Sequence, residues 1–288
     1  MAQPSVDTLE HGSYSESLYR VSGMLPLCPD LTPTESVLAQ YHSVGVIGIE
    51  RAFDQAKIDA VKDAFRQLVS LGIDHPDQLP PRIELQFERD AAHNLADLGP
   101  DERCDQVRKL MWFVDADPRF IDMAYDPNLL AMVEACTGYE VEMYQEMALF
   151  KPPSIGREKP WHQDNAYFNV PEGTPVVGVW IALDAATLEN GCMHFLLGEH
   201  VHGPRPHFNI RDWQLCDTDI EGETIVAAPI PEGGALIFDG LAPHGTPKNT
   251  SGARRRALQF HYVPKGTPRT DSSDRLRIFG AEGFGATC

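Results

Sequence analysis

The 288-residue sequence lacks a surplus of positive charge and a long apolar run. Its 24 Lys and Arg residues are outnumbered by 42 Asp and Glu residues, which gives a formal net charge of −18. Such a chain offers no basic surface for nucleic acid or for an anionic membrane. No stretch approaches the apolar length needed to cross a bilayer, and residues 1–28 are polar without the hydrophobic segment of a signal peptide. We therefore expect neither nucleic acid nor a membrane as a partner.

The sequence also lacks a cysteine framework. Its six cysteines form neither a CxxC pair nor a regular spacing: Cys28, Cys104, Cys136, Cys192, Cys216 and Cys288. This pattern resembles neither a zinc cluster nor the disulfide frame of a secreted domain. A reducing compartment suits such thiols, so we expect a cytoplasmic protein.

One histidine and one aspartate are spaced so that both side chains can bind one metal ion. His162 and Asp164 lie two positions apart in residues 151–168, KPPSIGREKPWHQDNAYF. Positions i and i+2 of a strand point to the same face, so both side chains can reach one metal while Gln163 turns away. Such a pair alone is also typical of a solvated loop. His244 lies downstream in APHGT, and two imidazoles with one carboxylate leave open positions on iron(II) for an organic acid and O2. The sequence thus predicts a mononuclear iron site.

The surroundings of His244 predict how Arg255 reaches the same site. Residues 233–239 form an apolar run typical of a buried strand, residues 247–252 are rich in turn formers, and residues 254–264 suit a returning strand. We expect a hairpin that brings Arg255 beside His244, where its guanidinium can grip a carboxylate with two hydrogen bonds. The returning strand has a polar face and an apolar face: Arg255, Ala257, Gln259 and His261 on the first, Leu258, Phe260 and Tyr262 on the second.

Five motifs occur in an order that resembles a known family. They are YHSVGVIGIERAF, KLMWFVDADP, EMALFKPPSIGREKPWHQDNAYF, GVWIALDAATLENGCMHFLLGEH and APHGTPKNTSGARRRALQFHY, between about Gln40 and Pro264. Through them the chain resembles the phytanoyl-CoA dioxygenase family of Fe(II)/2-oxoglutarate oxygenases. The resemblance implies a double-stranded β-helix, a cupin-like jelly roll. It also implies iron held by His162, Asp164 and His244, with 2-oxoglutarate and O2 as co-substrates.

The resemblance assigns further residues to the co-substrate. It implies that Arg255 holds the remote carboxylate of 2-oxoglutarate. It also implies that five residues line the co-substrate pocket: Lys109, Met147, Gln163, Trp180 and Thr246. Thr246 stands where the family often has Ser, and the hydroxyl is retained. Trp180 would equally suit a plain core position, and Lys109 an exposed one. Five more histidines are interpreted as structural or substrate-side groups, because a fourth protein ligand would close positions that oxygen needs: His194, His200, His202, His207 and His261.

The chain reads as mainly β with bracing helices. We expect an irregular N-terminal arm over residues 1–30 and a single Fe(II)/2-oxoglutarate dioxygenase domain over residues 31–288, with its β core at about 141–264. Helices are predicted over residues 32–41, 54–71 and 119–136, the last broken near Asp126-Pro127, and a strand over residues 44–49. Residues 73–105 and 200–223 are predicted to form loops over the mouth of the barrel.

The implied reaction is hydroxylation of an unactivated C–H bond of a small molecule, with release of succinate and CO2. Asp164 fills the position that a halide takes in related halogenases, so hydroxylation is favoured, whereas desaturation, ring closure and epoxidation stay open. The alternatives are an acyl-CoA hydroxylase, a metal-dependent hydrolase or isomerase, and a binding protein without catalysis. The acidic chain should repel CoA thioesters, and three aromatic residues near the mouth favour an apolar skeleton in secondary metabolism: Phe168, Phe208 and Trp213. They would equally suit loop packing. The sequence does not indicate an oligomeric state.

Overall fold

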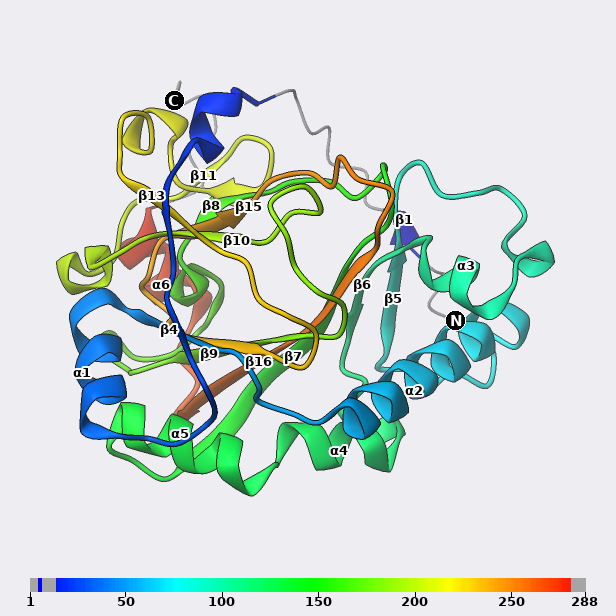
Figure 1. Ribbon diagram of the computed structural model, residues 1–288, viewed down its shortest axis with the longest axis horizontal. Coiled ribbons are helices and arrows are strands. Elements are labelled where there is room, and N and C mark those ends of the chain that lie inside the picture. The colour runs from blue at the N-terminus through cyan, green and yellow to red at the C-terminus, as the bar shows by residue number, and fades with distance from the viewer. Residues whose placement is uncertain (1–4, 7–13, 281–288) are drawn as a thin grey trace.

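The computed structural model, which describes residues 5–6 and 14–280, consists of two facing β-sheets with helices on the outer side of the larger one (Figure 1). The larger sheet has nine strands in the order β1 (Ser5–Val6), β5 (Glu84–Phe87), β6 (Val107–Met111), β7 (Val141–Lys151), β16 (Arg255–Pro264), β9 (Val177–Ala182), β14 (Ala235–Asp239), β4 (Val46–Ile49) and β3 (Leu27–Cys28). The smaller sheet has five, in the order β2 (Val21–Met24), β13 (Ile225–Ala228), β10 (Met193–Leu196), β15 (His244–Thr246) and β8 (Lys159–His162). A separate short ribbon pairs β11 (Phe208–Asn209) with β12 (Trp213–Gln214).

Four helices cover the outer face of the larger sheet: α1 (Glu35–Val44), α2 (Gln55–Asp74), α4 (Pro118–Ala124) and α5 (Pro127–Thr137). Figure 1 shows α2, α4 and α5 along the lower side of this sheet. Phe65 of α2 packs edge-on against Phe150 of β7, with ring centroids 5.4 Å apart. These apolar contacts bury the outward face of the sheet and hold its strands in place. Two shorter helices lie elsewhere: α3 (Pro100–Cys104) and α6 (Ser272–Phe279).

Local sequence signals set the ends of these helices. Asp54 caps α2 by accepting a hydrogen bond from the amide of Lys57. The predicted break at Asp126-Pro127 separates α4 from α5, where Asp126 caps the second helix and Pro127 occupies its first position. The first helix begins later than residues 32–41 suggested, because Thr34 is its capping residue, and it ends at Gly45, whose φ of 80° requires glycine.

A second core lies between the two sheets. Phe195 of β10 and Phe238 of β14 meet across it, with ring centroids 5.6 Å apart. Two facing, mainly antiparallel sheets packed in this way form the double-stranded β-helix that the sequence predicts, so the expected fold class is confirmed. No helix among residues 14–280 is long and apolar enough to cross a membrane.

Three short strands replace part of the predicted irregular arm. Within residues 1–30, β1 pairs with β5, β2 pairs with β13 and β3 pairs with β4, while residues 1–4 and 7–13 lie outside the described part of the chain. The sheet also begins before residue 141, because β4, β5 and β6 belong to it. The predicted loop 73–105 contains β5, in which Leu85 and Phe87 are buried. Strands of two to four residues carry too little alternation to be recognised in the sequence.

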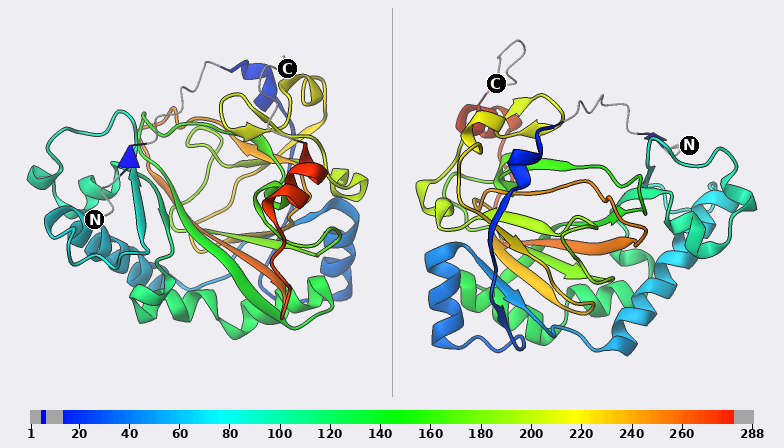
Figure 2. Two further views of the ribbon diagram at one scale, coloured as in Figure 1. Left: turned by 180° about the vertical axis from the view of Figure 1, so that it is seen from behind. Right: turned by 45° about the horizontal axis from the view of Figure 1, so that its top comes forward.

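The predicted hairpin between residues 233–239 and 254–264 is wrong. β9 lies between β14 and β16 and pairs with both of them. After β14 the chain crosses to the smaller sheet as β15, and it returns to the larger sheet as β16, which pairs on its other side with β7. Figure 2 shows β7 and β16 running side by side through the middle of the molecule. Arg255 therefore approaches His244 from the opposite sheet.

Candidate metal centre and its cavity

Three side chains converge where the ends of β8 and β15 meet. His162 is the last residue of β8, His244 is the first of β15, and the two lie opposite each other in the antiparallel pair. Asp164 opens a short 3₁₀ helix over Asp164–Tyr167. Oδ1 of Asp164 is 3.3 Å from Nε2 of His162 and 3.7 Å from Nε2 of His244. One ligand atom from each residue lies within 4.8 Å of the other two, and all three residues are buried.

The alternation predicted for residues 162 and 164 holds although the strand ends between them. Gln163 keeps an extended backbone, with φ −110° and ψ 131°. An extended residue turns its two neighbours to the same side. His162 and Asp164 therefore face one point.

The hydrogen bonds of the two imidazoles fix their tautomers. Nδ1 of His162 lies 2.8 Å from the carbonyl oxygen of Pro160, and Nδ1 of His244 lies 2.9 Å from that of Ala242. A carbonyl can only accept, so each Nδ1 carries the proton and each Nε2 presents a lone pair to the centre. Burial lowers the pKa of His244 to about 3, and His162 adds to this effect. A neutral ring with a free Nε2 is the form that binds iron(II).

Asp164 completes a donor set that fits a divalent metal. Burial by itself raises the pKa of this carboxyl, but the neighbouring imidazoles of His261 and His244 outweigh burial and hold the pKa well below its usual range. Asp164 is therefore a carboxylate at neutral pH. Two imidazole nitrogens and one carboxylate oxygen on one side of an ion match the facial arrangement of non-haem iron(II) sites.

The centre opens into a cavity of about 610 Å³ between the two sheets. Five of the six residues assigned to the co-substrate line it: Lys109, Met147, Trp180, Thr246 and Arg255. Burial lowers the pKa of Lys109 to about 8, with the positive charge of Lys159 as the next cause. A lysine with this pKa is still largely protonated at neutral pH.

Arg255 is a buried cation with unused donors. The residue is 2% exposed, and its guanidinium carbon lies 5.3 Å from the centroid of the Trp180 ring. Nη1 donates to the carbonyl oxygen of Leu149 at 3.2 Å, whereas Nε has no partner among the described residues. Burial lowers its pKa to about 10, so it remains charged at neutral pH. A buried guanidinium with free N–H groups is suited to bind the carboxylate of an organic acid.

Gln163 does not line the cavity, which corrects the sixth assignment. Its side-chain amide donates to the carbonyl oxygens of Gly203 at 2.9 Å and Leu241 at 2.8 Å, and its oxygen accepts from the amide of Arg205 at 2.8 Å. The alternation that aims residues 162 and 164 at the centre aims the residue between them into the opposite loops. Gln163 thus anchors the segment around residues 203–205.

Two residues on the predicted polar face of residues 254–264 contact the centre. Gln259 and His261 of β16 each place a nitrogen within 2.9 Å of Oδ2 of Asp164. Their side chains share a face with Arg255, and the apolar face carries Leu258, Phe260 and Tyr262 into the helix-covered core, as predicted. The sequence placed Gln259 and His261 on the same strand face as Arg255, but it did not indicate that they bind Asp164.

The remaining candidates lie apart from the three ligand atoms. Among the described residues a single group of three or more metal-ligating side chains comes together, and it contains none of His194, His200, His202 and His207. Nε2 of His207 instead accepts a hydrogen bond from the backbone N–H of Gln163 at 3.0 Å. Of the three aromatic residues expected near the mouth, Phe168 lines the cavity, whereas Phe208 and Trp213 do not. Trp213 packs with Ala166 and Phe279, so loop packing is the correct interpretation of this residue.

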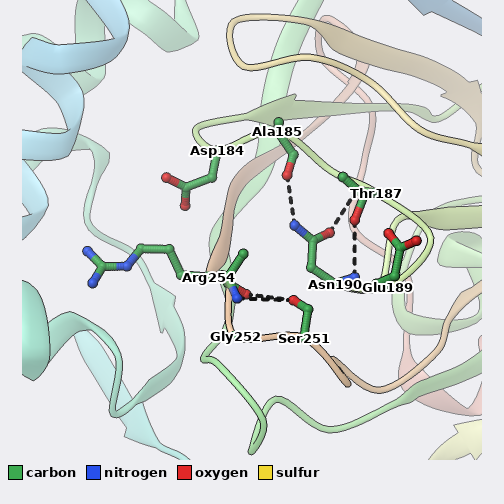
Figure 3. A pocket seen from close by; sticks show the side chains of 9 residues that line it. Asp184, Ala185, Thr187, Glu189, Asn190, Ser251, Gly252 and Arg254 are labelled. Carbon is green, nitrogen blue, oxygen red and sulfur yellow. Dashed lines mark hydrogen bonds between the residues drawn. The ribbon is translucent and has the colours of Figure 1, made fainter.

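A second cavity, of about 630 Å³, lies at the connections 184–190 and 251–254 and holds no predicted site residue (Figure 3). Asn190 within it bonds to the carbonyl of Ala185 and to Thr187. Ser251 likewise bonds to Asn249 and Ala253. These polar groups stabilise turns, so this cavity is structural.

The fold and the centre match those of the 2-oxoglutarate-dependent non-haem iron oxygenases, a class whose members use iron(II), 2-oxoglutarate and O2. The family model described as phytanoyl-CoA dioxygenase (PhyH) matches residues 41–257, which is most of the chain. The chain therefore belongs to the phytanoyl-CoA dioxygenase family.

One relative is similar in sequence, and two solved structures are similar in fold. Phytanoyl-CoA dioxygenase domain-containing protein 1 of Danio rerio is 31% identical over 155 residues, 51% of this chain and 53% of that protein. The chain thus matches about half the length of this relative. The structure of EvdO2 from Micromonospora carbonacea is similar with a TM-score of 0.65, 23% identity and coverage of 88% of this chain and 98% of that one. SnoK, a non-haem α-ketoglutarate-dependent carbocyclase from nogalamycin biosynthesis, is similar with a TM-score of 0.62, 17% identity and coverage of 82% and 86%.

Proposed function

We propose that the protein hydroxylates an unactivated C–H bond of a small-molecule substrate. One oxygen atom of O2 would enter the substrate as a hydroxyl group and the other would enter succinate, while 2-oxoglutarate loses CO2. The observation that carries this proposal is that the His162, Asp164 and His244 ligand atoms and the unused donors of Arg255 face one cavity. A hydrolase or isomerase with the same three ligands would have no use for a buried, unsatisfied arginine in that cavity.

One group of residues would bind the metal, and a second group would bind the co-substrate. His162, Asp164 and His244 would hold iron through Nε2, Oδ1 and Nε2, and the iron, once bound, would supply the oxidation chemistry. Arg255 would bind the remote carboxylate of 2-oxoglutarate and orient the co-substrate. Lys109 would add a second positive charge near this dianion. Trp180 and Met147 would exclude water from the reacting atoms.

The cavity supports a compact substrate with polar groups. Its volume of about 610 Å³ must hold 2-oxoglutarate together with the substrate. Along the wall, Lys159 pairs with Asp212 at 2.6 Å and contacts the hydroxyl of Tyr167 at 2.9 Å. These groups can bind hydroxyl or acid functions, while Phe168 offers an apolar contact. We favour a secondary-metabolite tailoring reaction over acyl-CoA hydroxylation, and the described role of SnoK in nogalamycin biosynthesis supports this choice.

Location and domain structure form the rest of the proposal. The five cysteines within residues 14–280 are all free thiols, which supports a reducing cytoplasm. One apolar cluster joins residues from α1 to β16, which supports treating residues 31–288 as a single catalytic domain.

The test first measures binding of 2-oxoglutarate to the iron(II) protein and then measures which substrates stimulate the formation of succinate. Iron(II) and 2-oxoglutarate added without oxygen should produce a weak visible charge-transfer band, which a hydrolase or a binding protein would not give. With oxygen, succinate should form faster with the right substrate than without one. A panel of acyl-CoA thioesters, the matching free acids and polycyclic or terpenoid alcohols, assayed at low salt, then separates the two substrate classes. Stimulation by the thioesters alone would exclude the tailoring role.

A further inference from the structure

The second carboxylate oxygen of Asp164 is held by two side chains of β16. Nε2 of Gln259 lies 2.9 Å from Oδ2, and Nε2 of His261 lies 2.8 Å from the same atom. All three residues are buried, each less than 5% exposed, so water does not compete for these contacts. Oδ1 remains directed at the Nε2 atoms of His162 and His244.

The geometry identifies both nitrogens as donors. The carboxylate of Asp164 can only accept, and the amide nitrogen of Gln259 can only donate. Nε2 of His261 lies 3.0 Å from that amide nitrogen as well as 2.8 Å from Oδ2. Placing the proton on Nε2 gives the histidine a charge-assisted bond to Oδ2, whereas an unprotonated Nε2 would leave two acceptors in contact. Two N–H groups therefore converge on one oxygen.

We propose that Gln259 and His261 are positioning residues that make Asp164 a ligand through one oxygen only. A carboxylate can bind a metal through one oxygen or through both. Because Oδ2 is already engaged by two donors, only Oδ1 can turn to the metal. This leaves open the positions that 2-oxoglutarate and O2 need, one of which a second carboxylate oxygen would occupy. The inference rests on the proposed role of Asp164 as a metal ligand.

The same strand also carries the arginine assigned to the co-substrate. Arg255, Gln259 and His261 lie on one face of β16, and Arg255 and Gln259 are separated by roughly 13 Å along an extended strand. β16 pairs with β7 on one side and with β9 on the other, so it is a central strand with little freedom to shift (Figure 2). One rigid strand thus sets both the orientation of the metal carboxylate and the place of the co-substrate acid group.

The experiment removes each donor and measures metal binding. His261→Phe keeps a ring without an N–H, and Gln259→Leu keeps the branched shape without an amide. Gln145→Leu is the matched control, because Gln145 lies opposite His261 on β7 and lines the cavity but has no bond to Asp164 among the described residues. Affinity for cobalt(II) is measured on the metal-free proteins without oxygen, together with the visible cobalt spectrum and the melting temperature.

Each donor variant should bind cobalt(II) about 10- to 100-fold more weakly than the parent, as is typical when a partner of a metal ligand is removed. The cobalt bands should weaken, because a carboxylate that binds through both oxygens raises the coordination number. His261→Gln can place an amide N–H near the same point and should recover most of the lost affinity. The control variant should keep the parent affinity and spectrum. If His261→Phe fails to fold, Gln259→Leu decides the question by the same measurements.

Asp164→Ala separates this inference from the function on which it rests. If Asp164→Ala binds cobalt(II) as the parent does, the proposed metal centre itself is wrong. If Asp164→Ala loses the metal while the folded Gln259→Leu variant keeps both the parent affinity and the parent spectrum, the centre stands and the positioning role is wrong. A loss of affinity in Gln145→Leu equal to that in Gln259→Leu would also contradict it, because the effect would then not depend on Oδ2.

Discussion

His162 and His244 lie opposite each other on the paired strands β8 and β15, with ring centroids 4.2 Å apart and ring planes inclined at 51°. Strand register brings them together, and backbone carbonyls hold the outer nitrogen of each ring. The two imidazoles are therefore in place before a metal arrives, since neither depends on the ion for its orientation. This arrangement predicts that the fold survives the loss of a ligand.

His244→Ala should remove most tightly bound iron and abolish 2-oxoglutarate turnover while the protein stays folded. The buried His244 ring packs against Phe195 and Phe238 of the core between the sheets, so its loss should lower the melting temperature of the metal-free protein. The helix-covered core does not include His244, so unfolding should remain cooperative. Iron content, succinate formation and thermal unfolding check this together. His202→Ala serves as the control, because His202 is exposed and outside the ligand group. Full activity in His244→Ala would show that the ligand assignment is wrong.

Arg255→Ala should retain iron but bind 2-oxoglutarate far more weakly. Truncating one partner of a buried charged pair costs about 2–5 kcal/mol, which corresponds to roughly 30- to 5,000-fold in affinity. Titration of 2-oxoglutarate into the iron(II) protein without oxygen measures the change. Arg254→Ala is the control, because Arg254 pairs with Asp105 at 2.7 Å and does not line the cavity. A larger loss of affinity in the control would contradict the assignment of Arg255.

Arg256→Ala should lower the stability of the protein without changing its affinity for 2-oxoglutarate. Arg256 donates to both carboxylate oxygens of Asp184 at 2.8 Å, and it is buried. Arg256→Ala leaves Asp184 without this partner, and breaking a buried pair costs about 3–5 kcal/mol of stability. Denaturant unfolding should therefore show a lower free energy of unfolding for this variant. Its affinity for 2-oxoglutarate, measured under conditions in which it is folded, should match that of the parent. Unchanged stability would mean that the Asp184 pair contributes nothing.

The sequence predicted the centre better than the path of the chain around it. The convergence of His162, Asp164 and His244 could be predicted because the residue types suited to iron(II) are few and strand alternation is a local rule. The relation of Arg255 to His244 was predicted from a hairpin that does not exist, since the pairing of β14 and β16 with β9 depends on contacts that are distant in sequence. Gln163 was assigned to the cavity by resemblance, although alternation had already turned its side chain away. Local geometry was the better guide at that position.

The affinity for 2-oxoglutarate should fall as the pH rises above about 8 if Lys109 binds the co-substrate. Burial and the charge of Lys159 lower the pKa of Lys109 to about 8 in the free protein. Lys109 is protonated below that pH, so the affinity for 2-oxoglutarate is at its maximum there. Above that pH the affinity should decrease by at most about tenfold per pH unit. Anaerobic titrations between pH 6.5 and pH 9 would be compared with Lys109→Arg, whose charge persists over the range. An identical pH dependence in that variant would assign the decrease to another group.

Gln163→Leu should destabilise the protein without a large loss of 2-oxoglutarate affinity. The substitution leaves the carbonyls of Gly203 and Leu241 and the amide of Arg205 without their side-chain partner. These three hydrogen bonds are partly buried, and losing one such bond typically costs about 0.5–1.5 kcal/mol, so the midpoint of denaturant unfolding should fall. Because the side chain points away from the cavity, anaerobic titration should give an affinity within a few-fold of the parent, in contrast to Arg255→Ala. A stable variant with a large loss of affinity would instead return Gln163 to the co-substrate pocket.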